Sequence, residues 1–203
     1  REFGMLIDHT DNPVMRLIVN TTRQASLSGP ALADSHRNVG RALAMSIGQD
    51  LKLEEIAIDH VAGVSTGVQI QIGSEPIVVA MMRAGLFVAE GIWTTLPGSS
   101  LVLHSSASTL EAIPAFARTV VVVDSVINSG HSIRTVLKTL SGYQPTKIKV
   151  AALVAFRENL EILVSEFPSV DFHIARISDR SYVGKGSTDT GSRLFRTTTC
   201  GCE

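Results

Sequence analysis

The 203 residues carry 18 Lys and Arg against 19 Asp and Glu, a formal net charge of −1, and 44% of them are hydrophobic. This length and composition suit one α/β domain with a core of its own. The charges are scattered without a basic stripe and no apolar run reaches membrane-spanning length, so we expect neither nucleic acid nor a membrane as a partner. No signal sequence is recognised at the start, which predicts a cytoplasmic protein. Arg1–Gly4 are interpreted as a vector-derived remnant, and residues 5–203 as a single domain.

The N-terminal third predicts one long helix followed by a β-hairpin. Ala31–Ile47 places apolar side chains along one helical face, with His36 among them. Ile56–Val61 and Val68–Ile72 alternate apolar and polar residues on either side of Gly63–Gly67. This pattern is typical of a hairpin, and we expect it to be appended to the main sheet.

From residue 77 onward, buried strands alternate with helices. We expect, in chain order, strand Ile77–Met81, a helix to about Leu96, strand Leu101–His104, a loop over Ser105–Pro114, strand Val120–Val123, helix Ile133–Leu140, strand Lys149–Phe156, helix Glu158–Glu166 and an edge-like strand Val170–Ala175. Asp179–Arg193, rich in Gly, Ser and Thr, predicts an irregular active-site loop. The alternation predicts an α/β fold with a doubly wound, mainly parallel sheet flanked by helices.

Val120–Val123 begins the most informative segment of the chain. Four β-branched residues in a row are typical of a parallel strand that is buried on both faces. Asp124 follows at the carboxyl end, where open α/β sheets place their ligands. A loop of small and polar residues, Asn128–Ser132, then leads into the next helix. An acid can accept hydrogen bonds from sugar hydroxyls, and loop N–H groups at a helix N-terminus can hold a phosphate, so the segment predicts a sugar-phosphate site.

Metal-ligating residues do not gather into a recognisable cluster. The two cysteines, Cys200 and Cys202, stand on the C-terminal tail without a histidine nearby, and the six histidines are dispersed. The pattern therefore predicts no structural metal site.

One further similarity is carried by three separated segments, Met82–Leu86, Val120–Ser132 and Tyr182–Phe195. The first resembles the Leu-Arg-Ala-Gly-Leu pyrophosphate loop of the uracil phosphoribosyltransferase family. The second resembles the phosphoribosyl-pyrophosphate signature of type I phosphoribosyltransferases in general. The third resembles the uracil-binding segment of the uracil phosphoribosyltransferase family. The match runs from about Pro13 to Thr197, and three elements in this order are much more specific than a phosphate loop alone.

The resemblance implies phosphoribosyl transfer from phosphoribosyl pyrophosphate to uracil or a related base, giving a nucleoside monophosphate and pyrophosphate. It also implies Mg²⁺ held mainly by the substrate, and a homodimer or larger homo-oligomer. It assigns catalytic roles to Asp124, Arg83 and Asp189. It assigns phosphoribosyl binding to Asp124, Asn128, Ser129, Gly130, His131 and Ser132; pyrophosphate binding to Arg83, Ala84, Gly85 and Arg23; and base binding to Tyr182, Val183, Gly184 and Asp189.

Two parts of the chain depart from the family pattern. Ser105 stands where the family has the arginine of a hood over the pyrophosphate, and the base segment is altered at Lys185, Ser187, Thr188 and Ser192. Two alternatives therefore stay open: a non-catalytic homologue that binds a ribose phosphate or nucleotide, and a phosphoribosyltransferase for another acceptor.

Single site residues also have purely structural alternatives. Asp124 could cap a strand end, Arg83 could pair with a carboxylate, and Asp189 could form only an Asx-turn. We expect His131 to be a solvated loop residue rather than a catalyst.

Overall fold

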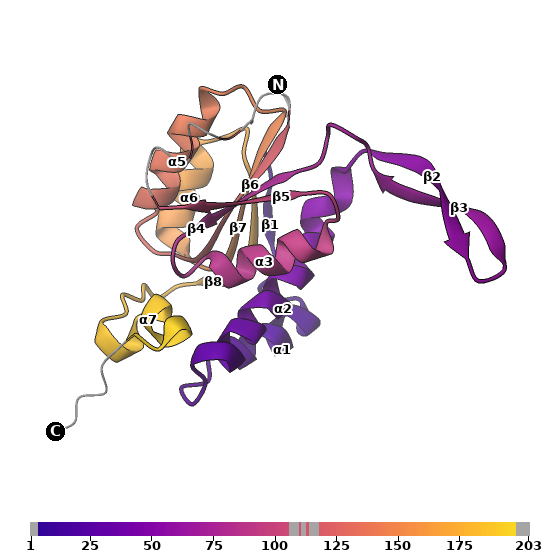
Figure 1. Ribbon diagram of the computed structural model, residues 1–203. Coiled ribbons are helices and arrows are strands. Elements are labelled where there is room, and N and C mark those ends of the chain that lie inside the picture. Colours follow the sequence, from indigo (N-terminus) through magenta and orange to yellow (C-terminus); the bar gives the residue numbers. More distant parts are fainter. Residues whose placement is uncertain (1–3, 106–109, 111–112, 114–117, 198–203) are drawn as a thin grey trace.

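The computed structural model of the chain describes residues 4–105, 110, 113 and 118–197. Its body is a six-stranded parallel sheet in the order β1-β8-β7-β6-β4-β5, and β2 and β3 form a separate antiparallel hairpin (Figure 1). The strands are β1 (Leu6–Asp8), β2 (Leu53–His60), β3 (Gly63–Ile70), β4 (Ile77–Met81), β5 (Ser100–His104), β6 (Thr119–Ile127), β7 (Lys147–Phe156) and β8 (Asp171–Ser178). The helices are α1 (Pro13–Thr22), α2 (Gly29–Ile47), α3 (Leu86–Thr95), α5 (His131–Ser141), α6 (Arg157–Glu166) and α7 (Thr190–Phe195), with short 3₁₀ turns at η1 (Gly48–Asp50) and η2 (Gly186–Thr188).

Helices cover both faces of the sheet, and the four valines of β6 show why. Val120 and Val122 pack into a cluster with residues of α5 and α6. Val121 and Val123 pack on the opposite face, into a cluster built with α1, α2 and α3. All four are fully buried. The predicted doubly wound α/β fold with a parallel sheet is therefore confirmed, because a strand with two apolar faces needs helices on both sides. Within the described residues, no helix is long and apolar enough to cross a membrane.

The N-terminal segment contains two elements that the sequence patterns did not predict. β1 has three residues, too few to show a period, and it pairs in parallel with β8. The prediction that β8 is an edge strand is therefore wrong, because β1 covers its outer side. Helix α1 is rich in β-branched residues, which weakens its helical signal. Its start is nevertheless encoded, since Asn12 accepts a hydrogen bond from the Met15 N–H at 3.0 Å and Pro13 follows as the first helical residue.

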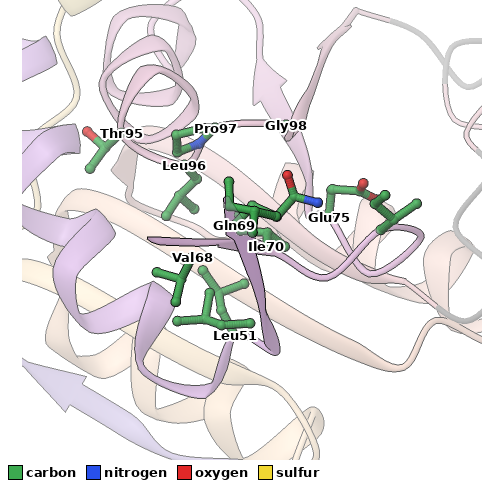
Figure 2. A pocket seen from close by; sticks show the side chains of 12 residues that line it. Leu51, Val68, Gln69, Ile70, Glu75, Thr95, Leu96, Pro97 and Gly98 are labelled. Atoms are coloured by element: carbon green, nitrogen blue, oxygen red, sulfur yellow. The ribbon is translucent and has the colours of Figure 1, made fainter. Parts of the chain in front are cut away.

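The predicted hairpin is confirmed and projects away from the sheet (Figure 1). Its strands are longer than expected, and the turn is at Val61 and Ala62. Gly63–Gly67, expected to connect the strands, belong to β3, with His60 opposite Gly63. Apolar residues at its base and at the end of α3 line a cavity of about 590 Å³ (Figure 2).

The C-terminal segment is more ordered than the expected loop. It contains η2 and then α7, whose Leu194 is buried against Leu32 and Ala33 of α2. Figure 1 shows α7 standing off from the sheet beside the α2 end of the molecule. Most of the expected loop 105–114, and both cysteines, lie outside the described residues.

Candidate active site

Asp124 lies in β6, which continues to Ile127 instead of ending at Val123 as expected. Its Oδ1 accepts a hydrogen bond from the Ser125 N–H at 2.7 Å. Burial raises the pKa of Asp124 to about 7, although the N–H groups of Ser125 and Val126 favour the charged form. A carboxylate that is desolvated before any ligand arrives is well placed to gain hydrogen bonds from sugar hydroxyls.

The loop Asn128–Ser132 packs against helix α6 and exposes polar side chains to solvent. The Asn128 carbonyl accepts a hydrogen bond from the Asn159 amide of α6 at 2.7 Å. Gly130 has φ +72°, and a Cβ there would lie 2.7 Å from a methyl group of Leu163, so a larger residue is disfavoured twice. Ser129, His131 and Ser132 are exposed at the start of α5. A helix N-terminus fronted by small residues suits a phosphate.

Against Ser125, the residue after Asp124, lies His36 of α2, which the sequence patterns did not assign to the site. Its Nε2 is 3.1 Å from the Ser125 hydroxyl and its Nδ1 is 3.0 Å from the Leu32 carbonyl. A carbonyl can only accept, so Nδ1 carries the proton and Nε2 accepts from Ser125. Burial lowers the pKa of His36 to about 4. A signal for it existed in the sequence, since His36 is the polar residue on the apolar face of the helix.

The Arg83–Gly85 loop lies directly against β6. A Cβ at Gly85 would come within 2.5 Å of the Val123 carbonyl oxygen and 3.1 Å of the Asp124 Cα, so only glycine allows this approach. The Arg83 side chain is half-exposed, with Nη1 donating to the Thr197 hydroxyl at 3.1 Å. The structure thus brings the predicted pyrophosphate loop next to the predicted ribose-binding acid.

Asp189 comes to the same loop from the C-terminal segment. Its Oδ2 lies 4.0 Å from Arg83 Nη2 and also accepts from the Ser192 N–H at 2.7 Å, which caps α7. Asp189 therefore has a structural role as the N-cap of α7, which differs from the Asx-turn considered for it, and it also places a charge near Arg83. At half exposure this ion pair contributes little to stability.

The predicted base segment forms a compact loop before Asp189. The Tyr182 hydroxyl donates to the Thr188 carbonyl at 2.6 Å, and the Thr188 hydroxyl closes a turn with the Lys185 backbone. Gly184 packs tightly, because a Cβ there would lie 2.6 Å from the Thr188 carbonyl oxygen. Tyr182, Val183 and Lys185 are exposed.

Helix α7 fixes this segment to the rest of the molecule through aromatic contacts. The rings of Phe195 and Phe87 are 5.3 Å apart, with the Arg37 guanidinium 4.7 Å above Phe87 and that of Arg83 5.8 Å above Phe195. Arg193 donates to the backbone carbonyls of Gln24 and Leu27. The C-terminal segment is therefore tied both to the Arg83 loop and to the N-terminal part of the chain.

Two residues that were expected near the pyrophosphate, Arg23 and Ser105, are not seen in contact with Arg83 in the described part of the chain. Arg23 lines a cavity with Arg16 and Arg176 at the end of β8, and the contacts of Arg83 do not include it. Ser105 is exposed just after β5, and residues 106–109 of the expected hood lie outside the described part.

Comparison with known proteins agrees with this arrangement. The family model for uracil phosphoribosyltransferase matches residues 9–197. Uracil phosphoribosyltransferases of Staphylococcus carnosus and Macrococcus caseolyticus are 27% and 28% identical to this chain, each covering 92% of it and 96% of the relative.

Solved structures show the same fold at lower identity. The AQ2163 protein of Aquifex aeolicus superposes with a TM-score of 0.79 at 22% identity, over 96% of this chain and 99% of that one. A hypoxanthine phosphoribosyltransferase of Staphylococcus aureus gives a TM-score of 0.52 at 12% identity, over 92% and 93%. The fold is thus that of type I phosphoribosyltransferases, and with a family match over nearly all its length the chain belongs to the uracil phosphoribosyltransferase family.

Proposed function

We propose that the protein transfers the phosphoribosyl group of phosphoribosyl pyrophosphate to uracil or a closely related base. The observation that supports the proposal is the close approach of Gly85 to Val123 and Asp124 of β6, because it brings the loop that carries Arg83 against the strand that carries Asp124. A sugar held by Asp124, with its 5′-phosphate on the Asn128–Ser132 loop, would place its pyrophosphate toward Arg83.

The chemistry then follows from charge. A ring nitrogen of the base attacks C1 of the ribose, the bond from C1 to the pyrophosphate oxygen breaks with its electron pair going to that oxygen, and the proton of the nitrogen passes to pyrophosphate or water. Positive charge develops on the sugar and negative charge on the leaving group. Arg83 stabilises the leaving pyrophosphate, and Asp124 holds the ribose in line. Val183, Gly184 and Asp189 stand on the segment that would orient the base.

One carboxylate near the Arg83 loop suits Mg²⁺. Asp189 Oδ2, which lies 4.0 Å from Arg83 Nη2, would offer the ion one protein oxygen. Hard oxygen donors in small number fit an ion whose other ligands are water and substrate oxygens. When bound, Mg²⁺ would neutralise pyrophosphate charge, and Asp189 is the carboxylate within 4.0 Å of Arg83 in the part of the chain that the structure describes.

The proposal is tested by measuring pyrophosphate release from phosphoribosyl pyrophosphate with each of a panel of nucleobases, with and without Mg²⁺. We expect release with uracil or another pyrimidine and none without base or metal. If pyrophosphate is released only with a purine, the acceptor is a purine instead of uracil. If no base gives release, the proposal that the protein is an enzyme is wrong.

A second candidate, a non-catalytic protein that binds a ribose phosphate or nucleotide, is favoured by one observation. Ser105 is exposed at the position where the family pattern has its hood arginine. A serine cannot supply the positive charge that this arginine would place on a leaving pyrophosphate. Calorimetry would show nucleoside monophosphate binding without turnover in this case.

Ser105→Arg discriminates between the two candidates. In an enzyme slowed by the missing charge, we expect kcat for pyrophosphate release to rise about tenfold, since a single group of this kind can contribute a few kcal/mol. Ser105→Gln, of comparable length without charge, is the matched control. A Ser105→Arg protein that binds phosphoribosyl pyrophosphate and still does not turn over would favour the binding role.

We also infer that the chain forms a homodimer or larger homo-oligomer. The hairpin exposes large apolar side chains, and Val61, Val64 and Val68 have exposed fractions of 101%, 78% and 62%. Apolar surface of this kind is commonly covered by a partner. Light scattering should give at least twice the chain mass of 21.7 kDa, and a mass of one chain would contradict the inference.

A further inference from the structure

Three arginines, two from α1 and its C-terminal cap and one from β8, line one small cavity at the carboxyl end of β8. We call it the arginine pocket. It has a volume of about 240 Å³ and is lined by Thr10, Arg16, Val19, Asn20, Arg23, Ala175, Arg176 and Ile177. None of these described lining residues is acidic, so the pocket collects three positive charges.

The pocket's cationic face is built by α1. Arg16, Asn20 and Arg23 follow at intervals of four and three residues, which places them on one side of the helix. Thr10 is already engaged, because its hydroxyl accepts from the Ile177 N–H at 2.7 Å and donates to Asp8 at 2.5 Å. The groups that remain for a ligand are the three guanidinium groups and the Asn20 amide.

The three guanidinium groups are unpaired within the part of the chain that the structure describes. Ten ion pairs are found there, and Arg16, Arg23 and Arg176 take part in none of them. The Arg176 Nε is completely enclosed and has no hydrogen-bond partner. Burial, reinforced by the charge of Arg23, lowers the pKa of Arg176. A buried donor without an acceptor is costly, so a fold that keeps one points to a ligand that supplies the acceptor.

We propose that the arginine pocket is a second anion site, which binds a multiply charged oxyanion of the phosphate class. Three guanidinium groups carry more positive charge and more N–H donors than a single carboxylate can pair with. Phosphate or pyrophosphate has enough oxygens to accept from all three. β7 separates β8 from β6, so the pocket is distinct from the phosphate loop that follows Asp124. The anion comes either from the transfer reaction, as released pyrophosphate, or from the surroundings, as free phosphate.

The test is calorimetric titration of the full chain with inorganic pyrophosphate and, separately, inorganic phosphate. An Arg83→Gln background removes the other cation expected to attract pyrophosphate, so one remaining site is expected there. Adding Arg176→Met should weaken binding at that site about tenfold or more, since a charge-assisted hydrogen bond contributes about 1.5–3 kcal/mol. Arg16→Gln and Arg23→Gln should weaken it in the same direction. Tighter binding of pyrophosphate than phosphate would identify the reaction product as the ligand, and the reverse would identify free phosphate.

Arg41→Gln is the matched control, because Arg41 is an exposed helical arginine that contacts only a neighbouring amide, that of Asn38. It should leave the titration unchanged. Arg176→Met should also unfold at the same or a higher temperature without anion, and lose the rise in unfolding temperature that pyrophosphate gives the wild type. Equal affinity in the Arg176→Met and parent proteins, or equal binding of acetate, would overturn the proposal. Because the readout is binding, an inactive base panel would leave this result unaffected.

Discussion

An Asp124→Asn variant should be more stable than the wild type at pH 8 and should lose phosphoribosyl transfer. The folded protein raises the pKa of Asp124 from 3.8 to about 7. Below pH 3.8 the carboxyl is neutral in both states and the shift has no effect. As pH rises through 7, the unfolded chain has already released the proton, so the native state carries the full penalty above that pH. Each pKa unit corresponds to 1.36 kcal/mol, so we expect a gain of about 2–4 kcal/mol in the free energy of unfolding.

The loss of activity has a separate cause. In the proposed function the Asp124 carboxylate accepts hydrogen bonds from two ribose hydroxyls. An amide cannot accept both in the same way, so we expect kcat/KM to fall by about 10²-fold or more. Urea unfolding at pH 8 and pH 4, together with the pyrophosphate-release assay, measures both effects. Asp179→Asn, on the exposed end of the Arg157 ion pair, controls for the loss of an acid. An Asp124→Asn protein that is less stable at pH 8, or fully active, would refute the assigned role.

The second large effect is loss of stability in mild acid, caused by two buried histidines. Burial lowers the pKa of both His36 and His173 from 6.5 to about 4. Above pH 6.5 each is neutral in both states. As pH falls from 6.5 to 4 the unfolded chain binds protons that the native state does not, so stability falls, by about 2–3 kcal/mol for each histidine. Asp124 acts in the opposite direction over the same range and offsets part of the fall.

Two variants separate these contributions. His36→Gln should flatten the dependence of unfolding free energy on pH between 6.5 and 4, and Asp124→Asn should steepen it. His131→Gln, on the exposed first turn of α5, is the control and should leave the slope unchanged. His36→Gln also frees the Ser125 hydroxyl, so KM for phosphoribosyl pyrophosphate should rise while the unfolding transition stays cooperative. An unaltered slope in His36→Gln would mean that this histidine titrates normally in the native state.

The sequence by itself determined the parts of the protein whose signal is local. Val120–Ser132 encodes strand, acid, loop and helix start within 13 consecutive residues, and the structure contains all four, with Asp124 inside the longer strand instead of after it. The valine run also predicted burial on both faces of β6, because the identity of consecutive side chains alone shows that neither face can meet water. The parallel sheet followed from the alternation of such strands with helices.

Tertiary structure decided what depends on residues far apart in the chain. Leu6–Asp8 is a strand only because β8 offers it a parallel partner, so the edge position was not visible in residues 170–175. The Ser125 hydroxyl meets His36 across 89 residues, and Arg83 comes within 4.0 Å of Asp189 in the C-terminal segment. The arginine pocket likewise joins α1 to β8. Short segments and single polar residues show no hydrophobic periodicity in the sequence. Their positions are therefore determined only when tertiary packing brings their partners next to them.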